Sequence, residues 1–476
     1  MAIKTLIGLE IHVELSTDKK MFCNCRNQYG ADANTLVCPV CLGLPGALPV
    51  VDKQAVEYAL RAGLAFDCQI ADVIRMDRKN YFYPDLTKGY QISQSDNPLC
   101  SGGYLEIEPE AGPKRISLDR IHIEEDTGKQ LHTEDGTSLL DFNRSGVPLV
   151  EIVSNPDMNS SEEAKLFLEK LRNTLKYIGI SDVRMEEGSL RCDVNINVVD
   201  QEKGTRTSIT EVKNLNSFRS AVKAIEYEEA RHIRLLDEGE SNVKETRRWD
   251  EVAGETVIMR RKYTADDYRF ANEADITPIP VDREWVEEIR KSLPELPHAK
   301  KMRFMEDYSL SDYDAGVLTQ SQDLAHFFEE TLDHVKDAKL LGNWMMGDVL
   351  RRLKDEDKDF DQMPISSRDL ADLINLVKED KINNNTGKKV LREMFETGKA
   401  PGDIVKEKGL IQISDQGELE KIVIETLDSN PQSIEDFKNG KDRAIGFLVG
   451  QIMKATKGKA NPQLVNKLLM EKIKER

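Results

Sequence analysis

The sequence predicts an α+β protein in which an antiparallel-sheet domain precedes an all-helical domain and a small helical tail. The 476 residues exceed what one ordinary core holds, so about three domains are expected. Short β-rich runs occur up to about residue 290, and amphipathic helical periods follow. Four prolines separate the two parts, because proline continues neither a helix nor a central strand: Pro278, Pro280, Pro294 and Pro297.

The first domain, residues 1–293, combines strands with interspersed helices. Its β-rich runs end in turn signals, which is typical of strands. The predicted strands are residues 5–15, 104–108, 115–123, 147–153, 192–198 and 208–212. The predicted helices are residues 52–65, 161–178 and 217–236. This mixture favours an antiparallel sheet with helices between its strands.

Helical periodicity defines the second domain, residues 294–408. The predicted helices are residues 324–335, 341–353 and 370–377. Ser366 and Asp369 indicate a helix start, and Gly387 and Gly398 indicate helix ends. The remainder, residues 409–476, is predicted to be a small all-helical unit.

The net charge of -18 argues against nucleic-acid binding, which depends on lysine and arginine, but the charge is unevenly distributed. Residues 441–476 contain nine basic and three acidic residues. This basic end suits a protein that contacts RNA there. A lysine-rich solvated helix explains the charge equally well.

The chain has no uncharged apolar run near the ~20 residues that a membrane-spanning helix requires. Its N-terminal run contains acidic residues and lacks the pattern of a signal peptide. We therefore expect a cytoplasmic protein with no membrane partner.

Four cysteines form the pattern C-x-C, twelve residues, C-x-x-C: Cys23, Cys25, Cys38 and Cys41. In a reducing compartment this spacing favours tetrahedral Zn(II) over two disulfides or unrelated thiols. Four sulfurs leave no open coordination position, so the predicted role is structural.

Carboxylates recur on the β-rich runs of the first domain. Strand alternation places Glu10, His12 and Glu14 on one face, which taken alone could be a solvated face. Similar runs occur at residues 122–129, 185–193 and 210–214. Converging carboxylates repel unless a cation neutralises them, and Mg(II) prefers oxygen ligands. The pattern therefore predicts a magnesium site of the kind that handles ATP.

A loop rich in cations, tyrosines and amides follows Asp77 and includes Lys79, Tyr81 and Lys88. It could clamp phosphates or simply pack its aromatic residues on the surface. The chain lacks a P-loop motif and a G-x-S-x-G motif. Any glutaminase activity must therefore come from another subunit.

Residues 140–152, LDFNRSGVPLVEI, resemble the signature of the B-subunit family of tRNA-dependent amidotransferases. Further blocks resemble the same family: residues 8–14, 77–85, 185–193, 213–217 and 446–451. Together they run nearly end to end. The related archaeal E subunit carries an inserted domain for which this chain has no room.

The resemblance implies a cradle-shaped catalytic domain at residues 1–293, a helical domain and a YqeY-type tail that binds tRNA. The zinc knuckle that the cysteine spacing predicts at residues 23–41 lies in the first of these and is found in only some members of the family. The implied enzyme is an ATP-dependent carbon–nitrogen ligase with glutamine as amido donor. This chain would bind misacylated Glu-tRNA(Gln) or Asp-tRNA(Asn) and phosphorylate the side-chain carboxylate. Ammonia from an amidase-type A subunit would then form the amide, and a small C subunit would complete the heterotrimer.

The resemblance also implies the site residues. Mg(II) would lie among Glu10, His12, Glu125, Asp193 and Glu211. The positions that match Lys79, Tyr81 and Lys88 lie towards the ammonia tunnel and the phosphate in the family, and the expected catalytic residues are these three together with Glu125. Lys79, Lys88 and Arg144 are expected to bind ATP.

Two competing functions remain from the residues alone. One is a non-catalytic, zinc-containing scaffold that binds tRNA, and the other is a free-standing ligase that acts on a small molecule. Clustered acids favour catalysis over a scaffold, because they would repel RNA unless they held a metal. The basic end favours tRNA over a small molecule. The choice between the two misacylated tRNAs stays open.

Overall fold

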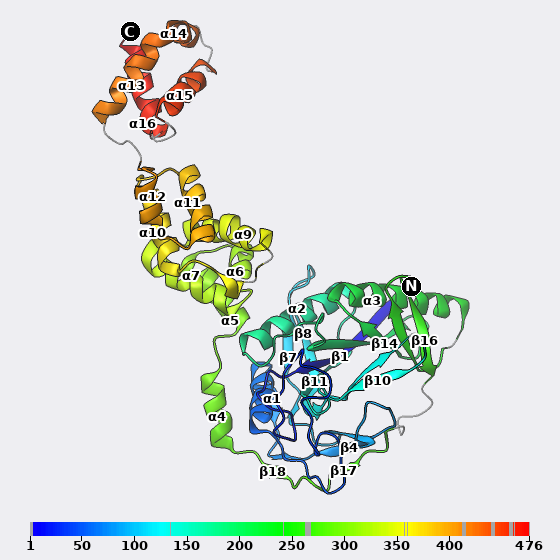
Figure 1. The fold of residues 1–476 in the computed structure, drawn as a ribbon. Coiled ribbons are helices and arrows are strands. Elements are labelled where there is room, and N and C mark those ends of the chain that lie inside the picture. Colours follow the sequence, from blue (N-terminus) through cyan, green and yellow to red (C-terminus); the bar gives the residue numbers. More distant parts are fainter. Residues whose placement is uncertain are drawn as a thin grey trace. The chain divides into compact units, whose positions relative to one another are not determined.

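The computed structural model describes residues 3–133, 135–240, 242–261, 268–356, 358, 360–411, 416–438, 443–456, 460 and 462–475. Contacts divide the chain into two compact units, Met1–Leu296 and Pro297–Arg476 (Figure 1). The first unit contains the strands and the second is helical, so the predicted α+β class is confirmed. The finer division at residues 293 and 408 stays a prediction.

The first unit is built on an 11-stranded sheet. Its centre has the order β12-β1-β11-β8, and all three pairings are antiparallel. The bounds of the sheet strands are β1 (Ile3–Glu14), β2 (Gln69–Ile70), β6 (Cys100–Ser101), β7 (Tyr104–Ile107), β8 (Lys114–Glu125), β11 (Pro148–Ser154), β12 (Leu190–Asp200), β13 (Thr205–Arg206), β14 (Thr210–Leu215), β15 (Glu245–Asp250) and β16 (Glu255–Arg261). Every strand predicted from the sequence has a counterpart here. The sheet is not purely antiparallel, because β14 and β15 pair in parallel across a helical crossover.

Helices cover one face of this sheet (Figure 1). They are α1 (Lys53–Ala65), α2 (Ser161–Tyr177) and α3 (Phe218–Glu238), as predicted, and α4 (Arg283–Ser292) packs on α1. Leu9, Ile11 and Val13 of β1 are fully buried in the core beneath them. Strand alternation therefore turns Glu10, His12 and Glu14 to the opposite face.

Three small sheets accompany the large one. Their strands are β3 (Val73–Ile74) with β18 (Ile279–Pro280), β9 (Lys129–His132) with β10 (Ser138–Asp141), and β4 (Asp77–Asn80) between β5 (Tyr90–Ser93) and β17 (Ala271–Asn272). Contacts between β5 and β8 bring the last of these sheets against the large one.

The second unit is helical throughout its described residues. Its elements are α5 (Pro297–Tyr308), α6 (Asp312–Leu318), α7 (Gln322–Val335), α8 (Ala338–Trp344), a π-helical turn (Met345–Val349), α9 (Leu350–Asp355), a 3-10 turn (Phe360–Gln362), α10 (Ser367–Lys378), α11 (Asn384–Thr397), α12 (Pro401–Glu407), α13 (Gln416–Ser429), α14 (Pro431–Lys438), α15 (Arg443–Ala455) and α16 (Pro462–Lys474). Apolar side chains gather in two clusters, one within residues 304–405 and one within residues 419–473. Among the described residues, no helix is both long and apolar enough to cross a membrane.

The predicted helix start at Ser366 and the predicted helix end at Gly398 are confirmed, and the predicted helix end at Gly387 is wrong. The Ser366 hydroxyl accepts from the Asp369 amide and caps α10, and Gly398 ends α11 at a φ of 67°. Gly387 lies inside α11 instead of ending a helix. It is buried there because Trp344 and Val377 pack against its backbone.

The basic end of the chain is only partly covered by the structure. Five of its charged residues lie outside the described residues: Lys441, Asp442, Lys457, Lys459 and Arg476. Within the described part, Lys472 of α16 pairs with Glu420 at 2.6 Å and with Glu475 at 2.9 Å.

Candidate functional site

A row of ionisable side chains crosses the centre of the large sheet on the face opposite the helices. His12 of β1 lies in register with Arg191 of β12 on one side and with Glu151 of β11 on the other. Glu151 in turn lies in register with His122 of β8. Register partners on neighbouring antiparallel strands share a face, so four strands supply this row.

The first cluster, which we call the histidine–carboxylate group, consists of His12, Glu124 and Glu151. The His12 Nε2 atom lies 3.4 Å from a carboxylate oxygen of each glutamate. Their candidate ligand atoms all lie within 4.8 Å of one another, a spacing that could hold a metal ion. Ser93 donates to Glu124 at 3.1 Å and orients it.

The field of these carboxylates changes the protonation of both histidines. Burial lowers the pKa of His12, but Glu151 and Glu124 outweigh this effect and raise that pKa above its usual value. The same balance raises the pKa of His122 to about 9. Since a metal-bound imidazole must be neutral, metal binding here would release a proton.

The second cluster, the tricarboxylate group, consists of Glu10, Asp193 and Glu211. Their ligand atoms also lie within 4.8 Å of one another, and all donors are oxygens, which suits Mg(II). Burial and the neighbouring carboxylates of Glu151 and Glu211 raise the pKa of Glu10. A cation is therefore favoured at this position.

Protein groups already partly neutralise the tricarboxylate group. The Lys213 ammonium pairs with Asp193 and lies 3.1 Å from a Glu211 oxygen. The Asn195 amide donates to Glu10 at 2.8 Å. These contacts hold the carboxylates in place on β1, β12 and β14.

Lys79 lies in β4, and Tyr81 directly follows this strand. Both side chains lie close to the carboxylate of Glu124. The Lys79 ammonium lies 4.9 Å from the ring centroid of Tyr268. Burial lowers its pKa, but Glu124 and Glu151 outweigh burial, and the net shift is upward. Among the described residues, no acceptor forms a hydrogen bond with this ammonium, which leaves it available to an anion.

The hydroxyl of Tyr81 is held by the side-chain amide of Gln91. This hydroxyl donates to the Gln91 side chain at 3.0 Å, and Gln91 donates to the Glu125 carbonyl at 2.6 Å. Burial and the field of Glu124 raise the pKa of Tyr81, so the phenol stays neutral.

The five predicted magnesium ligands do not form one cluster: Glu10, Asp193 and Glu211 form the tricarboxylate group, His12 belongs to the histidine–carboxylate group, and Glu125 belongs to neither. It follows Glu124 on β8, and adjacent strand residues point to opposite faces. Its carboxylate lies 2.6 Å from the Lys88 ammonium and accepts from the Ile92 amide at 2.9 Å. Lys88 and Glu125 line a cavity of about 260 Å³ that also borders Cys41. Glu124 and Glu151, which were not among the predicted ligands, lie beside His12.

Arg144 uses its guanidinium to fix a turn of the protein itself. It donates to the carbonyls of Thr127 at 3.0 Å and Gly128 at 2.9 Å. Its Nε atom lies 3.5 Å from Asp126, which also pairs with Arg191. If Arg144 also contacts ATP, as predicted, it would have to do so while keeping its hydrogen bonds to Thr127 and Gly128.

Glu14 continues the acidic face at the end of β1. Burial and the charge of Asp126 raise its pKa to about 8, although Arg191 and Arg144 oppose the shift.

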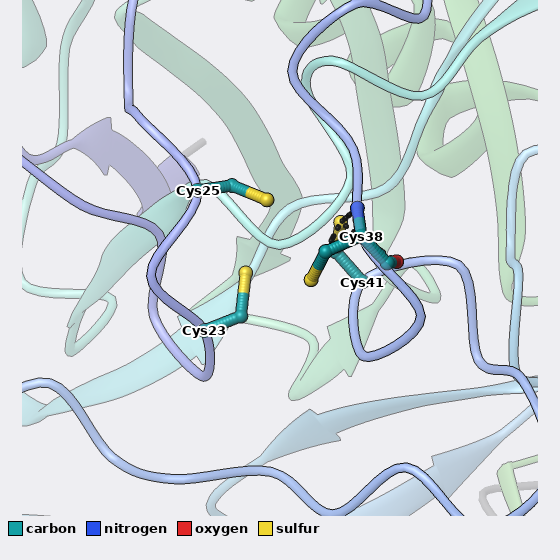
Figure 2. Close-up of side chains that lie close together, drawn as sticks. All are labelled: Cys23, Cys25, Cys38 and Cys41. Carbon is teal, nitrogen blue, oxygen red and sulfur yellow. Dashed lines mark hydrogen bonds between the residues drawn. The ribbon is translucent and has the colours of Figure 1, made fainter.

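The cysteine site consists of Cys23, Cys25, Cys38 and Cys41. Cys23 and Cys25 come from one segment and face Cys38 and Cys41 from another, as Figure 2 shows. The four sulfurs lie within 4.8 Å of one another, and the Cys38 amide donates to the Cys41 sulfur at 3.2 Å. The Cys23 thiol lowers the pKa of Cys41 to about 4 against the effect of burial, helped by the Cys38 amide and Lys20. This donor set fits a tetrahedral, structural Zn(II) ion.

Similarity to known proteins extends over both units. Residues 5–287 match the family described as GatB/GatE catalytic domain, and residues 326–473 match the family described as GatB domain. Three relatives, each named as the B subunit of an aspartyl/glutamyl-tRNA(Asn/Gln) amidotransferase, illustrate the match. That of Finegoldia magna is 55% identical over 473 residues, which is 99% of this chain and 100% of the relative. That of Caldicellulosiruptor saccharolyticus is 55% identical over 483 residues, covering 100% of both chains, and that of Clostridium tetani is 52% identical over 477 residues, covering 99% of both.

These matches cover both the sheet that carries the two acidic groups and the helices that follow it. They agree with the family predicted from the signature at residues 140–152. The chain therefore belongs to the family of aspartyl/glutamyl-tRNA(Asn/Gln) amidotransferase B subunits.

Proposed function

We propose that this chain binds misacylated Glu-tRNA(Gln) or Asp-tRNA(Asn) and phosphorylates the side-chain carboxylate of the aminoacyl group with ATP. A carboxylate is a poor electrophile because it has no good leaving group, and phosphorylation supplies one. The observation that carries the proposal is the pair of acidic groups on one face of the sheet beside the Lys79 ammonium. Such a set of metal ligands and a cation is the usual equipment for phosphoryl transfer.

The tricarboxylate group and the histidine–carboxylate group are the proposed Mg(II) sites. Mg(II), when bound, would offset the negative charge of the triphosphate. Asn195, Lys213 and Ser93 orient the carboxylates before any ion arrives. Lys79 would contact the transferred phosphoryl group, since its ammonium has no hydrogen-bond acceptor among the described residues.

The two proposed chemical steps balance. A carboxylate oxygen attacks the γ-phosphorus, and ADP leaves with the electrons of the broken P–O bond. Ammonia then attacks the acyl carbon, phosphate leaves, and one proton is lost from nitrogen. The cavity lined by Lys88 and Glu125 is the proposed route for ammonia, and the Glu125 carboxylate would accept its proton.

The proposed assembly is a heterotrimer. An amidase-type A subunit would release ammonia from glutamine, and a small C subunit would complete the complex. The YqeY-type tail would contact the tRNA. Zn(II) in the cysteine site would have a structural role, because four thiolates leave no position for substrate.

The test is transfer of label from γ-labelled ATP to Glu-tRNA(Gln) and Asp-tRNA(Asn), with Mg(II) and the chain purified with its A and C partners. We expect labelled acyl-phosphate only with a misacylated tRNA, and the preferred tRNA identifies the substrate. Asp193→Asn should abolish transfer while tRNA binding persists, because it removes a carboxylate of the tricarboxylate group. If the complex binds tRNA but transfers no label, the chain is a scaffold and the catalytic proposal fails.

A further inference from the structure

Lys20 lies beside the cysteine site and is completely excluded from solvent. Its ammonium donates to the Phe142 carbonyl at 3.2 Å and lies 3.7 Å from the Cys41 sulfur. Among the described residues, this ammonium forms no ion pair with a carboxylate. A buried ammonium is costly unless a negative charge lies close to it, so the sulfur is its counter-charge.

When the cysteine site holds a metal, its four deprotonated sulfurs would supply that negative charge. A divalent ion bound by four thiolates retains excess negative charge. Cys41 already accepts from the Cys38 amide, and the Lys20 ammonium approaches the same sulfur. Groups that donate to metal ligands from the outer sphere strengthen metal binding.

The second contact of Lys20 reaches the 141–146 loop, which lies within the signature block. Phe142 in this loop accepts from the Lys20 ammonium. The Ser145 hydroxyl donates to the Cys41 carbonyl at 3.1 Å. Gly146 has a φ of 88°, a backbone conformation that residues with a side chain rarely adopt, so glycine favours the turn that places this loop beside Cys41.

The same loop leads to the candidate site. Arg144 projects from it and holds the Thr127 and Gly128 carbonyls just after β8. The strand that ends there carries Glu124 and Glu125. A chain of direct contacts therefore runs from the cysteine site through Lys20 to the loop, and from the loop to the end of β8.

We propose that Lys20 is the outer-sphere charge partner of the cysteine-bound metal and that it couples metal occupancy to the position of the 141–146 loop. Lys20 is thus a positioning residue. The inference rests on the proposed zinc site and goes beyond it by giving one protein side chain a role in metal retention.

The first test compares Lys20→Met with the wild-type chain, both full length and loaded with zinc. Methionine keeps the length of the side chain and removes its charge. We expect zinc transfer to the chromogenic chelator 4-(2-pyridylazo)resorcinol to be at least about tenfold faster in the variant. Lys19→Met is the matched control, because the Lys19 ammonium is exposed and donates to the Asn24 side-chain oxygen at 3.0 Å instead of to a sulfur. Its transfer rate should match the wild type.

The outcomes separate the two proposals. A wild-type chain that contains no zinc after purification in zinc-supplemented medium overturns the zinc site and the role of Lys20 together. A zinc-containing wild type with an unchanged transfer rate in Lys20→Met overturns the role of Lys20 alone.

The second test needs no variant and therefore stands if Lys20→Met fails to fold. Zinc is removed from the wild-type chain, and amide hydrogen exchange of the 141–146 loop is compared before and after. We expect exchange in the loop to accelerate at least about tenfold, while the interior of α2 is unchanged. Equal exchange in the loop with and without zinc would overturn the coupling.

Discussion

Glu124 and Glu125 are adjacent in the sequence, yet they belong to different parts of the site. Glu124 lies within 4.8 Å of His12 and Glu151, whereas Glu125 pairs with Lys88 on the other face of β8. This separation predicts that the two residues serve different steps, although either substitution removes one carboxylate charge.

Glu124→Gln should lower label transfer from ATP to the misacylated tRNA at least about tenfold, because it removes a candidate metal ligand. Glu125→Gln should leave label transfer near the wild-type rate and lower formation of amidated tRNA with glutamine as donor. The two assays are run on the same purified complexes, and thermal unfolding checks that both variants remain folded. Equal loss of label transfer in both variants would contradict the division of roles.

The site residues on β1 were predicted from the sequence, whereas the residues that contact them from neighbouring strands were not. Alternation alone placed Glu10, His12 and Glu14 on one face, as the structure shows. Glu151 was missed although it lies inside the signature block, because its contact with His12 depends on the register between β1 and β11. Register between distant strands cannot be read from one sequence. Glu124 could have been found, since it shares the alternation phase of His122.

At the scale of elements, strands with apolar alternation were predicted and polar strands were not. The strands β15 and β16 were not predicted. The reason is that β15 buries charged and hydroxyl side chains, among them Glu245 and Thr246. Arg247 compensates by pairing with Glu245 at 3.1 Å and with the fully buried Glu228 of α3 at 3.3 Å. Such a buried ionic network has no hydrophobic period, so pattern analysis does not detect it.

Gly387 shows how tertiary packing overrides a local helix signal. Glycine usually favours a helix end, but here it lies in α11, where an ideal Cβ would be 2.8 Å from Val377 and 2.9 Å from Trp344. Overpacking should cost about 1–3 kcal/mol, and alanine gains ~1 kcal/mol in helix propensity, so Gly387→Ala should destabilise the helical core by a net amount of up to about 2 kcal/mol.

The measurement is hydrogen exchange of α10 and α11 as a function of urea, which reports on this core separately from the rest of the chain. Gly402→Ala in α12 is the control, since nothing lies within 4 Å of its ideal Cβ. That variant should be neutral or slightly more stable. A more stable Gly387→Ala would mean that Trp344 and Val377 move aside at little cost.

At the scale of the whole molecule, the residues alone predicted an acidic, metal-binding site and a basic end. The tRNA substrate and the ammonia donor came from the resemblance, because neither leaves a signature in composition or strand pattern. The net charge of -18, taken alone, even argues against RNA binding. A protein with this charge reaches RNA only if its basic residues are gathered at one place.

The basic end can be tested by removing residues 412–476. The apolar cluster within residues 419–473 is separate from the cluster within residues 304–405, so the remaining chain should keep its own core and unfold as before. If lysines of the tail contact tRNA phosphates, the truncated complex should bind misacylated tRNA at least about tenfold more weakly and with a smaller salt dependence. Filter binding at several salt concentrations measures both quantities. Unchanged affinity and salt dependence would show that the tail lysines form a solvated surface, and tRNA binding would then have to come from the other parts of the complex.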